Sequence, residues 1–335
     1  MPKKRTPFDI ISIGSALRDV HYYTDQIDII DNPEPDPTKE QLLCIEYGAK
    51  IRSTNVHFEY GGGASNTAVN FAGLGLNTGI ITAVGKDPDG KAIAAHLEKR
   101  GVSAAYVQQH VTERTGFSFL LVDEETSERT ICIYYGASTD IVISKQVLQR
   151  ASAQWYYVSS LSGDHWHDQI QAIVASRAHI AWNPGGKQLS AGYEQLCDVL
   201  QKIHIILLNT DEARELILSK VGLSEKDIEH PEIMAKEIYS WGPNVVVVTD
   251  GKKGAYVYAG DEVYYQPSPK DHPVSIVGAG DCYGSSFVAG YIRYNGDISR
   301  SMELAQVNAT SVIHRIGSQN GLLHWEDLPK HIQVL

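Results

Sequence analysis

The stretch with the most informative chemistry lies near the C-terminus, where the chain reads SIVGAGDCYGSSFVAGY from Ser275 to Tyr291. Gly278 and Gly280 permit a tight backbone turn, and the small and apolar residues that follow predict a helix packed close to a sheet. Such a helix start directs unpaired N–H groups and the positive end of its dipole at one point, which suits a phosphoryl group. Asp281 lies in the first turn, where its carboxylate can accept a hydroxyl proton. The candidate catalytic positions are therefore Gly278, Ala279, Gly280 and Asp281, and the alternative is a plain helix cap after a tight connection.

Two further glycine patterns point to other nucleotide sites. Gly278, Gly280 and Gly284 have the GxGxxxG spacing of a dinucleotide-binding turn, but such a turn follows the first strand, with a ribose-binding acid about 20 residues on. An NAD(P)-dependent oxidoreductase is therefore the less favoured alternative. Residues 85–91, GKDPDGK, match GxxxxGK without the Ser or Thr that would hold magnesium, and their two aspartates would repel phosphates. We interpret them as a turn that starts a helix.

Polar residues also follow two predicted strands in the second half of the chain. Asn209 and Glu212 lie one helical turn apart just past a strand, at the edge where α/β sheets bind ligands. Their oxygens suit hydrated magnesium, although they equally form a helix capping box. Thr249, Gly251 and Gly254 follow the next strand, and they either line a nucleotide pocket or form a β-turn.

The N-terminal segments carry groups suited to a polyhydroxylated ligand. Asp19 lies just beyond the first strand, and Gly62, Gly63 and Asn66 open a helix with close backbone approach. Carboxylate, carboxamide and exposed N–H groups are good partners for hydroxyls, because every hydroxyl both donates and accepts. Caps and turns are the alternative at these positions.

The elements that must position these residues alternate along the chain, which predicts a doubly wound α/β fold around a largely parallel sheet. The predicted strands are Ile10–Gly14, Gly79–Val84, Trp155–Ser159, His179–Trp182, Ile203–Leu208 and Asn244–Thr249. The predicted helices are Ala64–Leu74, Lys91–Arg100, Asp168–Arg177, Asp211–Ser219 and Pro231–Trp241.

Two excursions interrupt this alternation, at about residues 20–60 and 113–136. Thr115–Tyr135 has two β-rich runs about an acidic turn, which predicts a hairpin. Tyr22–Tyr60 contains Pro33, Pro35 and Pro37, which exclude helix and central strand there. We interpret both as a small β-rich lid beside the main sheet, within one domain over residues 1–335; surface loops with an edge hairpin are the alternative. A further β-rich stretch covers Ala255–Tyr265.

The composition restricts the partners. The chain has 335 residues, of which 43% are hydrophobic and 21% charged, as in an ordinary globular protein. Its 29 Lys and Arg against 40 Asp and Glu give a net charge of −11, which disfavours nucleic acid and anionic membranes. No apolar run reaches the roughly 20 residues of a membrane span, so we expect a cytoplasmic protein. Four widely spaced cysteines predict reduced thiols.

Taken in this order, the segments resemble the ribokinase or PfkB family of carbohydrate kinases, from about Ile10 to the region of Gly317. The matching positions are Asp19 for the sugar-binding acid, Gly62, Gly63 and Asn66 for the glycine-pair signature, Asn209 and Glu212 for the NxxE magnesium motif, Gly251 and Gly254 for the nucleotide loop, Gly278 to Asp281 for the anion hole and base, and Asn308 for an adenine-side residue. The resemblance implies a ribokinase-like fold, ATP as co-substrate, Mg²⁺ held through water, and phosphorylation of a sugar or nucleoside hydroxyl. It also implies a lid that closes over the acceptor and, in many members, pairs in a homodimer.

The chain departs from the family pattern at Ser275 and Ile276, where the family has Asp-Thr. Those residues assist a monovalent-cation site in the family, so potassium activation is doubtful here. The departure also motivates a second hypothesis, a non-catalytic sugar or nucleotide sensor with the same fold. The acceptor stays open among a neutral sugar, a sugar acid, a sugar phosphate and a nucleoside.

Overall fold

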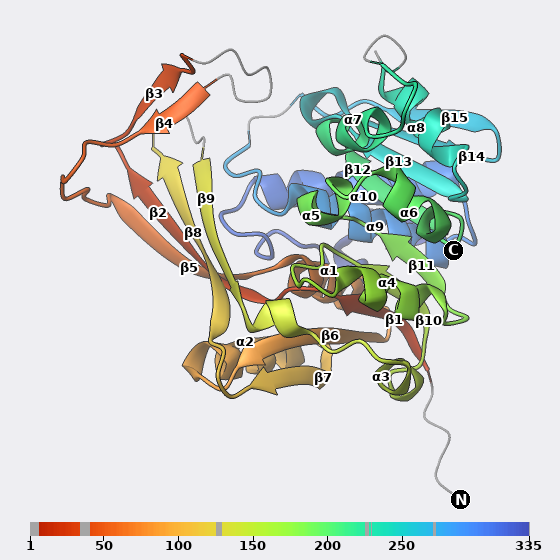
Figure 1. Ribbon diagram of the computed structural model, residues 1–335, viewed down its shortest axis with the longest axis horizontal. Coiled ribbons are helices and arrows are strands. Elements are labelled where there is room, and N and C mark those ends of the chain that lie inside the picture. The colour runs from red at the N-terminus through yellow and green to blue at the C-terminus, as the bar shows by residue number, and fades with distance from the viewer. Residues whose placement is uncertain are drawn as a thin grey trace, which may run out of the picture.

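The computed structural model describes residues 7–33, 41–124, 129–224, 228, 230–270 and 273–334. Its main sheet contains β1 (Phe8–Ile13), β6 (Thr78–Gly85), β7 (Ser103–His110), β10 (Ala153–Val158), β11 (His179–Trp182), β12 (Ile205–Asn209), β13 (Val245–Thr249), β14 (Ala255–Ala259) and β15 (Glu262–Gln266). The strand order is β15-β14-β13-β12-β11-β10-β1-β6-β7, parallel from β13 to β7 with an antiparallel hairpin at the other edge (Figure 1). The prediction of a largely parallel sheet is confirmed.

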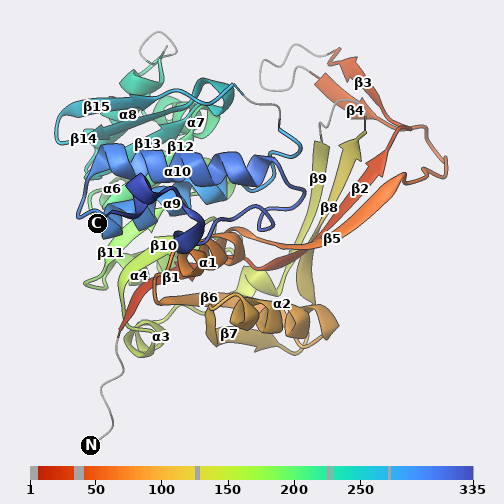
Figure 2. The same ribbon diagram turned by 180° about the vertical axis from the view of Figure 1, so that it is seen from behind.

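Helices cover both faces of this sheet. One face carries α3 (Lys145–Arg150), α4 (Trp166–Val174), α5 (Gly186–Leu189), α6 (Tyr193–Leu200), α7 (Thr210–Leu218) and α8 (Pro231–Tyr239). The other carries α1 (Gly63–Gly73), α2 (Pro88–Lys99), α9 (Ala279–Arg293), α10 (Ile298–Ile313) and α11 (Lys330–Gln333), as Figure 2 shows. Successive strand residues supply the two cores, since Ile10 packs on the α9 side and Ile11 on the α4 side. This is the doubly wound arrangement.

Every strand and helix predicted for the alternating pattern is present, with ends shifted by a few residues. Strand β7 was not predicted. It is the edge strand of the sheet, and its residues are half-buried or exposed, so its sequence SAAYVQQH lacks the apolar run of a central strand.

The lid is confirmed as a second sheet. It contains β2 (Leu17–Thr24), β5 (Asn55–Gly61), β8 (Thr115–Asp123) and β9 (Arg129–Gly136) in the order β5-β2-β8-β9, and it projects from the main body in Figures 1 and 2. The pairing of β8 with β9 is the predicted hairpin, whereas β2 and β8 pair in parallel. Strands β3 (Asp28–Asp31) and β4 (Gln41–Cys44) form a separate hairpin at its tip. Pro33 follows β3, and Pro35 and Pro37 lie outside the described residues.

The GxxxxGK segment starts a helix, as predicted. Asp87 is the N-cap of α2 and accepts a hydrogen bond from the Gly90 N–H (2.8 Å). The same carboxylate accepts hydrogen bonds from Thr115 N (2.7 Å) and Thr115 Oγ1 (2.6 Å), which tie the start of α2 to the lid. The four cysteines are free thiols. Within the described ranges, none of the helices has the length and apolar character needed to cross a membrane.

Candidate active site

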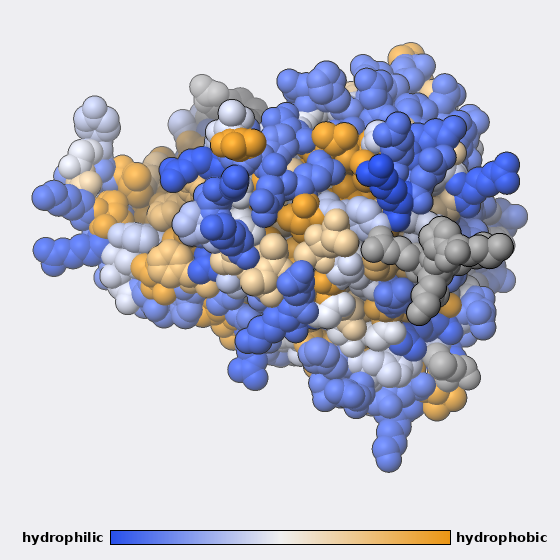
Figure 3. All heavy atoms as spheres, turned by 90° about the horizontal axis from the view of Figure 1, so that it is seen from below, coloured by the Kyte–Doolittle hydropathy of each residue, from blue (hydrophilic) through white to orange (hydrophobic). Residues whose placement is uncertain are grey.

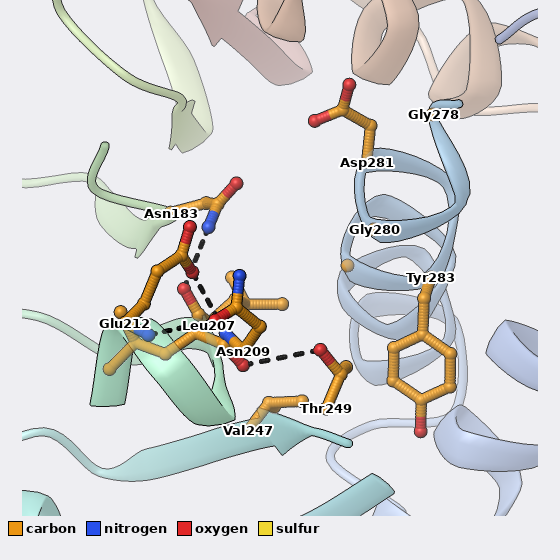
Figure 4. Close-up of a pocket in the computed structure, with 12 residues that line it drawn as sticks. Asn183, Leu207, Asn209, Glu212, Val247, Thr249, Gly278, Gly280, Asp281 and Tyr283 are labelled. Atoms are coloured by element: carbon orange, nitrogen blue, oxygen red, sulfur yellow. Dashed lines mark hydrogen bonds between the residues drawn. The ribbon is translucent and has the colours of Figure 1, made fainter. Parts of the chain in front are cut away.

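A cavity of about 260 Å³ opens at the carboxyl edge of β11, β12 and β13, next to the first turn of α9 (Figure 4). Parallel strands present their carboxyl ends at the same edge, so segments far apart in the sequence meet here. The lining residues are Asn183, Leu207, Leu208, Asn209, Glu212, Val247, Thr249, Gly278, Gly280, Asp281, Tyr283 and Gly284. Six of them were predicted as site residues from three separate motifs, and the fold brings all six together.

The start of α9 has the backbone geometry on which the predicted anion cradle depends. Gly278 is the N-cap with φ 77°, and a Cβ there would lie 2.3 Å from the Ser318 Cβ, so the turn requires glycine. Helical hydrogen bonding begins with Cys282 N donating to Gly278 O (2.9 Å), so the N–H groups of Gly280 and Asp281 precede the first helical bond. A Cβ on Gly280 would meet no heavy atom within 4 Å, which leaves the cradle open for a ligand.

Ala279 differs from its neighbours in this turn. Its N–H donates to the Ile276 carbonyl (3.3 Å). Among the described residues, Ala279 is not one that lines the cavity. The structure therefore assigns the open N–H groups to Gly280 and Asp281, and Ala279 shapes the turn between them and Gly278.

Asp281 projects from the first turn of α9 toward the side of the cavity that carries Asn183 and Glu212 (Figure 4). Asn66 Nδ2 donates a hydrogen bond to Asp281 Oδ2 (2.8 Å), although 215 positions separate the two residues. Burial raises the pKa of Asp281 to about 6, and the Asn66 hydrogen bond opposes this shift. A carboxylate with a pKa near 6 is ionised at neutral pH and is a better base than an exposed aspartate.

Asp19 lies near this carboxylate on the lid strand β2. Its side chain is buried, and burial raises its pKa to about 6, with a Ser118 hydrogen bond opposing and the negative charges of Asp281 and Glu59 adding to the shift. A Cβ on Gly61 would lie 1.8 Å from Asp19 Oδ2. Gly61 is therefore required for the approach of Asp19. It was not among the predicted site residues, although it is the first of three consecutive glycines.

The predicted N-terminal residues are not among those that line the cavity, but Asn66 and Gly63 approach Asp281 from the start of α1. Gly62 has φ 91°, and a Cβ there would lie 2.6 Å from the Ser15 carbonyl oxygen. A Cβ on Gly63 would lie 3.8 Å from Asp281 Oδ1, so this backbone borders the candidate base. The Asn66 amide has both polar ends engaged, because its oxygen accepts from Ser318 Oγ (2.8 Å) as well as from Gln319.

Asn209 and Glu212 form the capping box and line the cavity at once. Glu212 N donates to Asn209 Oδ1 (2.8 Å) and Asn209 N donates to Glu212 Oε2 (2.9 Å). Burial raises the pKa of Glu212, the hydrogen bond from Asn209 opposes this, and the charge of Asp281 raises it further. A cation between the two carboxylates would relieve their repulsion, so these oxygen donors fit hydrated magnesium. In the described part of the chain no three His, Cys, Asp or Glu side chains converge as a metal cage.

The predicted nucleotide residues divide into two groups. Thr249 lines the cavity at the end of β13. Gly251 (φ 48°) and Gly254 (φ 111°) shape the turn into β14, and a Cβ on Gly254 would lie 2.1 Å from the Gln266 carbonyl oxygen. The β-turn interpretation therefore describes their structural role. Asn183, at the end of β11, also lines the cavity and was missed, although a polar residue directly after a predicted strand is the signal that identified Asn209.

Asn308 requires a correction. Its side chain is fully buried, with Nδ2 donating to Asn70 Oδ1 (2.7 Å) and Ser286 Oγ (2.9 Å), and its oxygen accepting from Leu323 N (2.9 Å). Asn308 lies on α10, and its hydrogen bonds connect α10 to α1 and α9. Its side chain has no exposed surface for an adenine ring. The prediction of a nucleotide contact at Asn308 is therefore wrong.

Comparison with solved structures identifies the fold. The ribokinase of Arabidopsis thaliana complexed with ribose and ATP superposes with a TM-score of 0.78 at 19% identity, over 98% of this chain and 100% of that one. A putative ribokinase II of E. coli, in complex with ATP and Mg²⁺, gives a TM-score of 0.73 at 20% identity, over 97% and 99%. The two-sheet architecture is that of ribokinase-like proteins.

Sequence comparison identifies the family. The model of the pfkB family carbohydrate kinases matches residues 8–325. A nucleoside kinase of Methanothermobacter thermautotrophicus is 26% identical over 94% of this chain and 92% of its own length. The chain belongs to the pfkB family of carbohydrate kinases, and it is a phosphotransferase with an alcohol group as acceptor.

Proposed function

We propose that the protein transfers the γ-phosphoryl group of ATP to a hydroxyl of a sugar or nucleoside, with Asp281 as the general base. The observation that carries the proposal is the convergence at one cavity of the Asp281 carboxylate and the open N–H groups of α9, with Asn66 from the N-terminal half hydrogen-bonded to the same carboxylate. Phosphoryl transfer builds charge on oxygens in a loose transition state, so donors held in place contribute more than a strong base.

On the acceptor side, the Asn66 hydrogen bond to Asp281 Oδ2 leaves Oδ1 on the side of the Gly63 backbone. We place the reacting hydroxyl there, where Oδ1 orients it and takes its proton. Asp19, Asn66 and the backbone of Gly62 and Gly63 surround the acceptor. The lid strands that carry Asp19 close over it and exclude water, which otherwise competes for the phosphoryl group.

On the nucleotide side, the open N–H groups of Gly280 and Asp281, in the turn that begins at Gly278, face the transferring phosphoryl group. Asn209 and Glu212 hold Mg²⁺ through water, and the ion neutralises phosphate charge when bound. Thr249 lies at the phosphate end, and the turn with Gly251 and Gly254 borders the nucleotide. The structural neighbour from E. coli is a complex with ATP and Mg²⁺, which supports the choice of these two ligands for the fold.

A homodimer through the lid is part of the proposal. Phe58, Phe117 and Tyr134 lie on the same face of the lid sheet by strand register and expose 61%, 46% and 41% of their surface. Apolar side chains gather over the lid side of the molecule in Figure 3. Such a patch favours association of two lids. Sedimentation equilibrium of the wild type and of Phe58→Ser tests it, because a monomeric wild type would contradict the dimer.

The proposed function is tested by ATP consumption with Mg²⁺ against sugars, sugar acids, sugar phosphates and nucleosides, with and without potassium. We expect turnover with at least one sugar or nucleoside. The potassium arm addresses Ser275, whose hydroxyl accepts from Val277 N (3.3 Å) where the family has an acid. Ligand-induced stabilisation without turnover for every acceptor would favour the non-catalytic sensor.

A further inference from the structure

A chain of hydrogen bonds leads from Asp281 away from the cavity to helix α2. Asn66 donates to Asp281 Oδ2 (2.8 Å), and Gln319 Nε2 donates to Asn66 Oδ1 (3.0 Å). Gln319 Oε1 lies 2.8 Å from His96 Nε2. The four side chains come from α9, α1, the segment after α10, and α2. We call Asn66, Gln319 and His96 the amide relay.

The charge of Asp281 sets the direction of every bond in the amide relay. A carboxylate only accepts, so Asn66 must present its NH₂ group to Asp281 and its oxygen to Gln319. Gln319 then presents its NH₂ group to Asn66 and its oxygen to His96. His96 must therefore carry a proton on Nε2. Reversing either amide would place two acceptors in contact at the carboxylate or between the amides.

The relay is buried and has additional support on both sides. Gln319 is 5% exposed and Asn66 is 7% exposed, so a broken bond leaves a polar atom without water. Ser318 Oγ also donates to Asn66 Oδ1 (2.8 Å), and Gln319 Nε2 also reaches Ser65 Oγ (3.0 Å). These contacts hold the Asn66 amide in one orientation, and through it one oxygen of Asp281.

The far end of the amide relay contacts the base of the lid. The rings of His96 and Tyr60 stack with centroids 4.1 Å apart and an interplanar angle of 18°. The Arg18 guanidinium lies over the Tyr60 ring, 4.6 Å from its centroid. Arg18 and Tyr60 face each other across β2 and β5, where the lid joins the body. A movement of the lid base therefore acts directly on the His96 ring.

We propose that Gln319 and His96 are positioning residues for Asp281. Through them, the position of the lid where it joins the main body is coupled to the orientation of the Asp281 carboxylate. The inference rests on the proposed function of Asp281. Holding Oδ2 through the relay keeps Oδ1 directed at the acceptor hydroxyl, and small errors in such alignment slow a reaction strongly.

The charged groups around the relay fit this role. Burial lowers the pKa of His96, the Gln319 hydrogen bond opposes this, and Arg100, Lys99 and Arg18 lower it further. His96 is therefore neutral at neutral pH, with its one ring proton on Nε2. At the other end, Asp19 and Glu212 are the acids that interact with Asp281.

Two substitutions of His96 separate its hydrogen bond from its ring stack. His96→Phe keeps the stack on Tyr60 and removes the donor, whereas His96→Gln restores an N–H near the Nε2 position and removes the ring. His179→Phe is the matched control, because His179 also stacks on an aromatic ring, that of Trp155 (4.8 Å), and contacts His204 Nε2 through Nδ1 (2.7 Å). This pair lies at the amino ends of β11 and β12, whereas the cavity lies at their carboxyl ends. Thermal unfolding of each variant verifies that it is folded.

We expect His96→Phe to lower kcat about tenfold with KM for ATP unchanged. We also expect the acidic limb of the pH profile of kcat/KM to move to higher pH by about half a unit. His96→Gln should recover most of kcat, and His179→Phe should equal the wild type. A wild-type kcat and acidic limb in His96→Phe, or no recovery in His96→Gln, would overturn the inference.

A second variant and a measurement without turnover make the test independent of the His96 series. Gln319→Glu has nearly the same shape but cannot donate to Asn66, and we expect it to lower kcat about 10²-fold. The ¹⁵N shifts of His96 in the wild type should show the Nε2–H tautomer, and an Nδ1–H tautomer would overturn the relay whether or not an acceptor has been found. Loss of activity in Asp281→Asn combined with normal relay variants would refute the relay and leave the proposed function standing.

Discussion

Replacing Asp281 by Asn should make the protein more stable at alkaline pH while it removes most of the activity. The pKa of Asp281 is about 6 in the folded protein against 3.8 for an ordinary aspartate, because the carboxylate is desolvated. The difference is about 2 pH units, and at about 1.4 kcal/mol for each unit the charged form costs about 3 kcal/mol of folding free energy. An Asn side chain keeps the acceptor for Asn66 and carries no charge.

The sign of the pH dependence follows from the raised pKa. The folded state binds the Asp281 proton more tightly than the unfolded state, so stability is highest below about pH 4 and falls as pH rises through about 6. The advantage of Asp281→Asn is therefore about 3 kcal/mol at pH 8 and about half of that at pH 5. With an unfolding entropy of about 2.1 cal/mol/K for each of 335 residues, 3 kcal/mol corresponds to about 4 °C in Tm.

Scanning calorimetry of the wild type and Asp281→Asn at pH 8 and pH 5 measures this difference. Asp164→Asn is the matched control, because that carboxylate is exposed and its hydrogen bond and ion pair with Lys187 lower its pKa, so its removal should bring no gain. A Tm of Asp281→Asn equal to or below that of the wild type at pH 8 would show that Asp281 is not a desolvated carboxylate. In the same variant, turnover should fall by at least about 10² with substrate binding by calorimetry nearly unchanged.

Three further predictions concern the site. The kcat/KM profile should lose activity below about pH 6, as Asp281 takes up its proton, and a profile flat to pH 5 would contradict its role as base. Gly280→Ala should fill the anion cradle and lower kcat/KM for ATP by about tenfold or more while Tm stays unchanged. Gly278→Ala should lower Tm, because its Cβ would meet Ser318. A lower Tm in Gly280→Ala with an unchanged Tm in Gly278→Ala would contradict the cradle. Glu212→Gln keeps an acceptor for the helix cap and should raise the Mg²⁺ concentration for half-maximal rate, and an unchanged Mg²⁺ titration would remove Glu212 from the metal site.

Local patterns predicted most of the fold, because each depends on residues close in the chain. Apolar runs followed by helical spacing located the strands and helices of the main sheet, and proline and β-branched residues located the lid. Strand β7 escaped because an edge strand is half solvated and carries no such run. The parallel pairing of β2 with β8 also escaped, since it joins segments separated by about 100 residues.

The site shows the same division. Residue types and spacing were enough to select Asp281, its glycines and the Asn209–Glu212 pair, because a helix start and a strand end are local structures with predictable chemistry. The tertiary fold decided that Asn66 hydrogen-bonds to Asp281, that Gly61 admits Asp19, and that Asn308 is buried between helices. These outcomes depend on contacts between segments up to about 240 positions apart, and such contacts exist only once the two cores have packed.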